Sequence, residues 1–192
     1  MKRIYPRPGL LFITTLLVGF LLAGCSKEKV ETPVSHDHEQ MLNHMRYDED
    51  FKKNHKPLHW RTILELLQVR WATAKYRDFA KADADGYKTI DVIVPQMGHH
   101  FMKKPLTDDG KFDLTKPEIL VYRKNADGSH TLVAVEYAVP LNMSEKAPRG
   151  FYGNDDVWDR NTTFGLWLLH AWVWYKNPEG VFNPTNPKVH TH

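Results

Sequence analysis

Four segments rich in β-branched and aromatic residues constrain the fold more than any other feature of the chain. Residues of these types favour strands, because branched and flat side chains pack well on a pleated surface. The segments are TIDVIV (89–94), EILVYR (118–123), HTLVAVEYAV (130–139) and FGLWLLHAWVWY (164–175). The second and third flank a loop that contains Asp127 and Gly128, which predicts an antiparallel hairpin. The core must therefore be built around a β-sheet.

A helical pattern precedes the sheet, from Leu58 to about Asp85. Apolar residues recur there at steps of three and four, which places them on one face of a helix. These residues are Trp60, Ile63, Leu64, Leu67, Trp71 and Ala74. Pro57 suits the first turn, and Gly86 suits a left-handed cap just beyond the end. We expect an α+β fold in which this long amphipathic helix packs its apolar face on an antiparallel sheet.

A long connection, residues 144–163, lies before the last predicted strand. Loops of this length in compact domains are often lids or binding loops. The aromatic residues Phe151, Tyr152 and Trp158 argue against disorder in this one. Two roles are open for them. They cover an edge of the sheet, or they line a ligand pocket together with Trp172 and Trp174 of the last strand.

The N-terminus has the pattern of a secretory signal peptide. Lys2, Arg3 and Arg7 form a basic head, and residues 9–23 are almost wholly apolar. This run is shorter than the roughly 20 residues that a membrane-spanning helix needs. Its end, LLAGC, resembles the lipobox of bacterial lipoproteins. The resemblance implies cleavage before Cys25, a diacylglyceryl group on its sulfur and an acylated amine. The competing interpretation is an ordinary signal peptide followed by a chance cysteine.

A lipid anchor of this kind implies a location in the cell envelope. Two or three acyl chains hold a protein on a bilayer, whereas one chain gives only reversible binding. In a Gram-negative cell, Ser26 after the cysteine resembles the sorting pattern for the periplasmic side of the outer membrane. In a Gram-positive cell, the same anchor implies the outer face of the plasma membrane.

The chain thus divides into a lipoprotein signal peptide (1–24), a polar tether (25–57) and a single α+β domain (58–192). The tether is charged and has few apolar residues, which is typical of a flexible spacer. Its histidines either collect transition metals loosely or are incidental. They are His36, His38, His44 and His55.

The charge of the mature chain gives no reason to expect nucleic acid as a partner. Of 26 Lys and Arg residues, three precede Cys25, which leaves 26 − 3 = 23 basic residues against 23 acidic ones. Cys25 is also the only cysteine, so cysteine nucleophiles, thiol redox chemistry and thiolate metal sites are excluded. The GxSxG, Walker and HExxH motifs of common hydrolases and nucleotide enzymes are absent from the sequence.

One histidine, His170, stands in the apolar segment LWLLHAWVWY. Strand alternation places it on the same face as Trp172 and Trp174. A buried imidazole without a partner costs about 1–3 kcal/mol, so His170 should have one. Glu136 stands among apolar neighbours in the third strand. A buried carboxylate must be paired, bound to metal or protonated.

A further polar feature is the segment QMGHHF (96–101). If it is extended, His99 and His100 point to opposite faces of the strand, so only one of them can join a given site. MGHHF, KPEILVYR, LVAVEYAVP and LHAWVWYKNPEGVFNPTNP together resemble a family of exported bacterial proteins. That family has an MG-x-H-[YF] segment, a VEY strand and an LH-x-W-x-W strand followed by NP-x-G and another NP.

This resemblance covers most of residues 70–190 and implies no established activity. It implies that His100, Glu136 and His170 are the motif residues. His99 stands where the family more often has a hydrophobic residue. The family pattern often ends near a cysteine, whereas this chain ends in VHTH, so any role of that cysteine is absent here.

Two histidines and one carboxylate admit three interpretations. They bind Zn²⁺ with a water, Cu²⁺ or non-haem Fe²⁺, they form a buried polar pair, or they act as general acid and base without metal. Our leading hypothesis is a lipid-anchored, non-enzymatic envelope protein that binds zinc, copper or a small ligand through His100, Glu136 and His170. The alternatives are a metal-dependent hydrolase and a structural lipoprotein that docks another envelope protein.

Overall fold

The structure is a computed structural model that describes residues 57–190 of the 192-residue chain. The predicted signal peptide, Cys25 and the tether up to residue 56 lie outside this range. The described helices are α3 (Trp60–Thr73), the 3₁₀-helix η1 (Ala74–Arg77), α4 (Phe79–Ala84) and the short α5 (Lys104–Thr107). None of them is long and apolar enough to cross a membrane.

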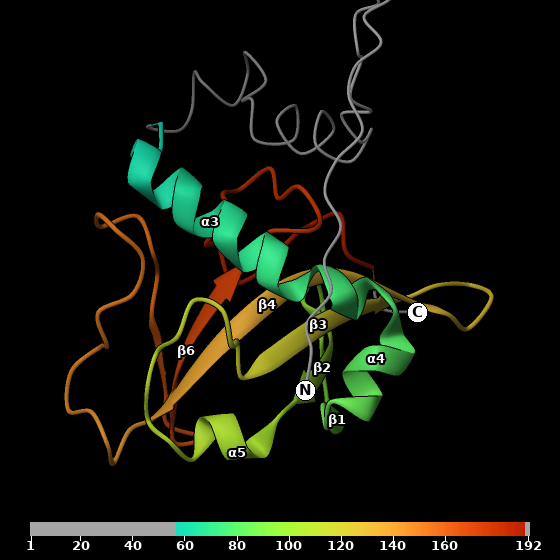
Figure 1. The fold of residues 1–192 in the computed structure, drawn as a ribbon, viewed down its shortest axis with the longest axis horizontal. Coiled ribbons are helices and arrows are strands. Elements are labelled where there is room, and N and C mark those ends of the chain that lie inside the picture. Colours follow the sequence, from blue (N-terminus) through green and yellow to red (C-terminus); the bar gives the residue numbers. More distant parts are fainter. Residues whose placement is uncertain (1–56, 191–192) are drawn as a thin grey trace, which may run out of the picture. The chain divides into compact units, whose positions relative to one another are not determined.

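The strands form one six-stranded antiparallel sheet in the order β1-β2-β3-β4-β6-β5 (Figure 1). They are β1 (Lys88–Val94), β2 (Gly98–Met102), β3 (Ile119–Lys124), β4 (His130–Pro140), β5 (Asp159–Asn161) and β6 (Leu166–Ala171). The α+β class and the hairpin, formed by β3 and β4, are confirmed. The three-residue β5 is too short to show a hydrophobic period, which is why the sequence did not predict it.

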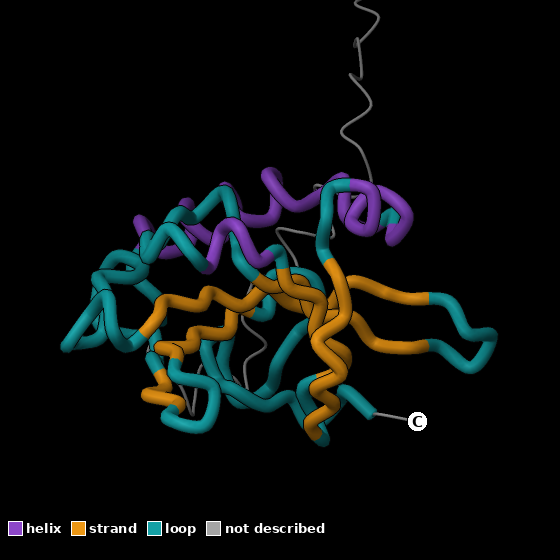
Figure 2. Tube along the Cα trace, turned by 90° about the horizontal axis from the view of Figure 1, so that it is seen from below, coloured by secondary structure: helices purple, strands orange, loops and turns teal. Residues whose placement is uncertain are grey.

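The helices cover one face of the sheet (Figure 2). Leu66 and Val69 of α3 share a buried cluster with Leu120 of β3 and Tyr137 of β4. The opposite face has its own apolar cluster, which joins strand residues to the C-terminal segment. Its buried members are Ile119, Val121, Val133, Ala134, Ala138, Trp172 and Val189. Both faces of the central strands are therefore covered, as their nearly continuous apolar sequences require.

The single long helix expected over residues 58–85 is interrupted. Asp78 has an extended backbone (φ −84°, ψ 105°) between η1 and α4. Its side chain accepts a hydrogen bond from the backbone N–H of Ala80 at 3.1 Å and so caps α4. Aspartate favours such caps over helix interiors, because its carboxylate competes for backbone N–H groups. The chain therefore turns at Asp78 and begins a second helix.

The face of α3 that contacts the sheet also differs from the predicted one. Its buried residues are Thr62, Leu66, Val69 and Thr73, whereas Trp60, Leu64 and Trp71 are exposed. The two threonines can be buried because each hydroxyl has an acceptor. Thr62 Oγ1 donates to the carbonyl of Tyr152 at 2.6 Å, and Thr73 Oγ1 donates to that of Val69 at 2.8 Å. Burying a hydroxyl group costs little free energy when the group has a hydrogen-bond acceptor. The prediction of the buried face of α3 was therefore wrong, because it relied on residue polarity alone.

Glu118, just before β3, is a buried carboxyl group with 1% of its surface exposed. Its Oε2 accepts a hydrogen bond from the backbone N–H of Ala138 at 3.0 Å. Burial raises the pKa of this carboxyl from its ordinary value of 4.5 to about 8, because the charged form loses its hydration. The charges of Asp109 and Asp113 act in the same direction. Glu118 is therefore protonated in the folded protein at neutral pH.

We expect Glu118→Gln to change how stability depends on pH. Because the folded pKa lies above the unfolded one, the Glu118 contribution is fully present below pH 4.5 and is lost as the pH rises to about 8. Glutamine stays neutral and keeps an acceptor for Ala138. The parent should therefore lose unfolding free energy relative to the variant, by up to about 1.4 kcal/mol per pH unit across this window. Denaturant titrations at several pH values measure this difference, and parallel curves for the two proteins would contradict it.

Candidate metal centre

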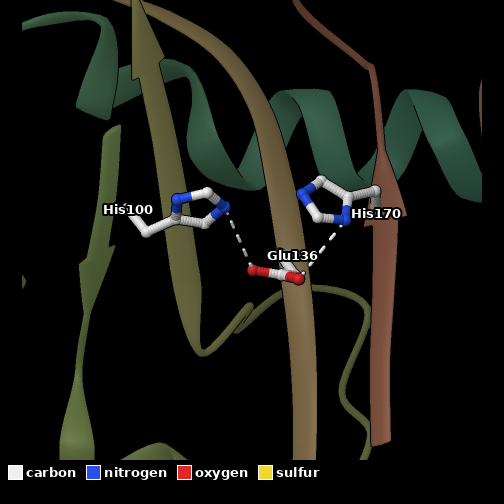
Figure 3. A group of neighbouring side chains, drawn as sticks. All are labelled: His100, Glu136 and His170. Carbon is white, nitrogen blue, oxygen red and sulfur yellow. Dashed lines mark ion pairs between the residues drawn. The ribbon is translucent and has the colours of Figure 1, made fainter. Parts of the chain in front are cut away.

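Three strands bring together the residues that the sequence singled out. His100 lies in β2, Glu136 in β4 and His170 in β6, all on the sheet face opposite α3 (Figure 3). Glu136 and His170 are direct partners in the β4–β6 register. His100 pairs with Val121 of β3, so it reaches Glu136 across one intervening strand. The convergence of all three residues is therefore produced by the strand order and the register.

The three side chains meet closely in a buried position. His100 Nε2 lies 3.6 Å from Glu136 Oε2, and His170 Nδ1 lies 3.3 Å from Glu136 Oε1. The two imidazole rings are nearly perpendicular (89°), with centroids 5.8 Å apart. One nitrogen or oxygen atom from each residue lies within 4.8 Å of the other two. The side chains are only about 4% exposed.

Trp172 holds the ring of His170 in place. The two rings stack with centroids 6.0 Å apart and planes inclined by 17°. The indole N–H of Trp172 donates to the carbonyl of Asn183 at 2.6 Å, which fixes that ring in turn. Nε2 of His170 is buried and has no hydrogen-bond partner among the described residues. A buried nitrogen of this kind is costly unless something binds it.

Burial disfavours the charged forms of both partners. It raises the pKa of Glu136, and the nearby carboxyl groups of Asp159 and Glu118 act in the same direction. It lowers the pKa of His170, and the neighbouring His100 acts in the same direction. The contacts of 3.3 and 3.6 Å exceed the roughly 2.7–2.9 Å of a strong charge-assisted hydrogen bond, so the pair compensates burial poorly. Without a cation, the neutral forms are favoured.

The residues suit a metal ion chemically. A metal selects neutral imidazole and ionised carboxylate, and binding releases the proton from Glu136. Two imidazole nitrogens and one carboxylate oxygen form a common three-ligand set for Zn²⁺, with one coordination position left for water. The same ligands suit copper and non-haem iron. The group could therefore hold a metal ion.

A cavity of about 620 Å³ adjoins the three ligands, all of which contribute to its lining. Its other walls are mostly apolar and come from several elements. They include Met97, Met102, Ile119, Val157, Phe164, Leu166 and Leu168. Pockets of this size typically accept small molecules. A metal ion held by His100, Glu136 and His170 would face this cavity.

None of the five aromatic residues predicted as pocket walls lines this cavity. Phe151 and Trp158 pack against Phe112 in the core on the α3 side. Tyr152 packs on His59, with ring centroids 4.5 Å apart. Trp172 supports His170 from beside the cavity.

Trp174 is the clearest correction, because it lies on the face opposite His170. β6 ends at Ala171, so strand alternation does not extend to residue 174. Trp174 Nε1 instead donates to Thr73 Oγ1 at 3.0 Å, on the α3 side. The long loop does reach the cavity, but through Val157, Asp159 and Asn161, and Phe164 joins them just after the loop. No pattern in the sequence marks these residues as cavity walls, since their position depends on how the loop folds back.

The prediction that His99 and His100 point to opposite faces is confirmed. His99 lies on the helix side, with its ring 6.3 Å from that of His130. Burial lowers the pKa of His99, with a smaller contribution from Lys124. Adjacent histidines thus have separate environments, and only His100 joins the candidate metal centre.

Gly98 allows β2 to lie close enough to β3 to present His100. Its φ is +102°, and a Cβ atom there would come within 2.7 Å of the carbonyl oxygen of Tyr122. Real Cβ atoms do not approach a backbone oxygen this closely, so any side chain would push β2 away from β3. Gly98 therefore sets the spacing that lets His100 reach Glu136.

We expect Gly98→Ala to lower the free energy of unfolding by about 1–3 kcal/mol and to displace His100. Gly128→Ala is a matched control, since Gly128 also has a positive φ (+84°) but has open space around it. The control should show the conformational cost alone, about 1–2 kcal/mol, and keep the centre intact. Denaturant unfolding and metal titration of both variants measure the difference. Equal losses of stability and of metal affinity would show that the close contact at Gly98 is unimportant.

No family model, curated protein or solved structure matches this chain. The resemblance of its motifs to an exported bacterial family stays a prediction. The chemistry of the three buried ligands and of the adjoining cavity is therefore the basis for assigning a function.

Proposed function

We propose that this protein is a metal-binding component of the bacterial cell envelope. His100, Glu136 and His170 hold a divalent ion, zinc or copper, on the face of the sheet opposite α3. The observation that carries the proposal is the convergence of three buried ligand atoms within 4.8 Å. A carboxyl group and two imidazoles that are almost fully buried are an expensive arrangement in the absence of a ligand.

The competing interpretation, a buried polar pair, accounts for less of the geometry. It explains why the side chains lie together, but the two contacts to Glu136, at 3.3 and 3.6 Å, are longer than strong charge-assisted hydrogen bonds. The pairing therefore compensates poorly for the burial of all three groups. A bound metal accounts for all three residues, because each supplies one ligand.

The location follows from the N-terminal motif. Cys25 in LLAGC is proposed as the lipidated residue, and the tether up to residue 57 holds the domain near the membrane. Ser26 supports the periplasmic side of the outer membrane in a Gram-negative cell. In a Gram-positive cell, the domain lies on the outer face of the plasma membrane.

The direct test is the metal content of residues 26–192 produced without a histidine tag. After dialysis against zinc or copper, we expect one tightly bound ion per chain and a higher Tm than for the metal-free protein. His100→Ala and His170→Ala should each weaken this binding by roughly 100-fold or more, since each removes one of three ligands. Isothermal titration and elemental analysis measure affinity and stoichiometry.

His99→Ala is the matched control for His100→Ala, because it removes the neighbouring histidine from the opposite face. It should leave the tight site unchanged. The tether histidines are the same in all of these proteins, so loose binding by the tether cancels in the comparison. Substoichiometric metal in the parent, together with an unchanged Tm on adding Zn²⁺ or Cu²⁺, would exclude the metal site and leave the structural interpretation.

One observation favours a second candidate function, a metal-dependent hydrolase. The three ligands line the cavity, so a water molecule in the fourth coordination position would face any molecule that enters it. A metal lowers the pKa of bound water and so generates a nucleophile at neutral pH.

We expect this candidate, if correct, to show zinc-dependent cleavage of activated carboxylic or phosphate esters. Glu136→Gln should then keep the fold, as judged by circular dichroism and Tm, and lose the turnover. Activity that survives both this substitution and chelation would arise elsewhere. Tight metal binding without any turnover would leave metal binding as the function.

A further inference from the structure

The most apolar face of α3 is turned away from the rest of the described structure. Trp60, Leu64 and Trp71 are 59%, 54% and 87% exposed. Their spacing of four and seven residues places them along one line of the helix, which we call the outer stripe. The buried line of the same helix, Thr62 to Thr73, lies on the opposite side. The outer stripe is therefore an apolar surface that no part of residues 57–190 buries.

The helical segment that carries the outer stripe is basic in sequence. Residues 60–77 contain four basic residues and one acidic residue, a net charge of +3. Three of the basic residues have partners away from the outer stripe. Arg70 donates to the carbonyl of Val173, Arg77 lies over Trp174, and Lys75 pairs with Asp85 at 2.6 Å. The acidic residue, Glu65, is directed toward the long loop, where its Oε2 accepts a hydrogen bond from the backbone N–H of Tyr152 at 2.6 Å. The guanidinium of Arg61 lies over Trp60, 5.2 Å from the ring centroid. Arg61 thus places a positive charge beside the exposed Trp60.

We propose that the outer stripe lies in the headgroup region of an anionic phospholipid bilayer, with α3 parallel to the membrane surface. Helices with tryptophan and leucine on one face and basic residues beside them bind in this way, through apolar burial and attraction to anionic lipids. Tryptophan is favoured at this depth, because its ring is both apolar and polar. A bilayer fits this combination better than an acidic protein would, since two indole rings need an apolar layer.

The preceding chain supports the bilayer as the occupant. Residues 26–56 are 56 − 25 = 31 residues that join Cys25 to the start of the described domain. A random coil of 31 residues has an end-to-end distance of roughly 30 Å, a length that would keep α3 near the bilayer that holds the proposed lipid anchor. The nearness of the bilayer rests on that anchor, but the affinity of the outer stripe for lipid does not.

Docking through α3 has a consequence for the candidate metal centre. α3 covers one face of the sheet, and His100, Glu136 and His170 lie on the other (Figures 2 and 3). A domain that lies on the membrane through the outer stripe therefore turns its cavity away from the lipid. Metal or a small ligand would enter from the aqueous side.

The test uses residues 26–192 without the acyl group, mixed with vesicles of phosphatidylcholine and phosphatidylglycerol. We expect the protein to sediment with these vesicles, to bind pure phosphatidylcholine more weakly, and to show a blue shift in tryptophan fluorescence. The variant Trp60→Ala/Leu64→Ala/Trp71→Ala should bind at least about tenfold more weakly. Met143→Ala is the matched control, since Met143 is 55% exposed but lies outside α3, and it should bind like the parent.

Unchanged circular dichroism and Tm would establish that the triple variant is folded. We expect this result, because the three substituted side chains are exposed. If the parent does not sediment with anionic vesicles, or if the triple variant binds as well as the parent, the proposal is wrong. In that event, a dimer that the triple variant abolishes would assign the outer stripe to a second copy of the chain. A lower Tm of a monomeric triple variant would assign it to residues 26–56. Because the protein in this test carries no lipid, its failure leaves the anchor at Cys25 and the metal centre untouched.

Discussion

The pairing of β4 with β6 is the interaction on which the candidate site depends. It places Glu136 directly opposite His170, and the β-carbons of such partners are about 4.5–5.5 Å apart. A shift of one residue in this register would turn Glu136 to the helix face, because successive side chains alternate. The apolar residues of β4 and β6 oppose that shift. It would move each of them from the cluster on one face of the sheet to the cluster on the other face, where the packing does not fit them. The hydrophobic pattern thus determines where the polar groups meet.

The sheet gives the molecule two sides with different chemistry. On the helix side, the hydroxyls of Tyr87, Tyr122 and Tyr137 donate to backbone carbonyls at 2.7–2.9 Å. Unpartnered buried nitrogens occur on both sides, since His99 Nε2 and Trp158 Nε1 on the helix side lack a described partner as His170 Nε2 does on the other. What distinguishes the second side is that a carboxyl group and two imidazoles lie together there and line a cavity. This grouping is what favours a ligand or metal at the second side.

Two carboxyl groups are buried among the described residues, and they differ in their surroundings. Glu118 has a backbone N–H partner, and burial favours its protonated form. Glu136 has two imidazoles beside it, which are groups that commonly bind metal ions in proteins. This difference in surroundings favours a structural role for Glu118 and a ligand-binding role for Glu136.

The sequence alone determined the α+β class and the β3–β4 hairpin, and it singled out His100, Glu136 and His170 as candidate site residues. These features depend on local pattern, because strand residues, a tight turn and polar residues in apolar segments are visible without tertiary contacts. Only the tertiary structure decided which face of α3 is buried, that Trp174 leaves the face of His170, and that Val157 and Phe164 reach the cavity. Each of these depends on a partner distant in the chain, such as the carbonyl of Tyr152 that accepts the Thr62 hydroxyl. Alternation predicts a side of a strand only as far as the strand continues. β6 ends at Ala171, and the backbone N–H of the next residue, Trp172, donates to the carbonyl of Val181 in the C-terminal segment.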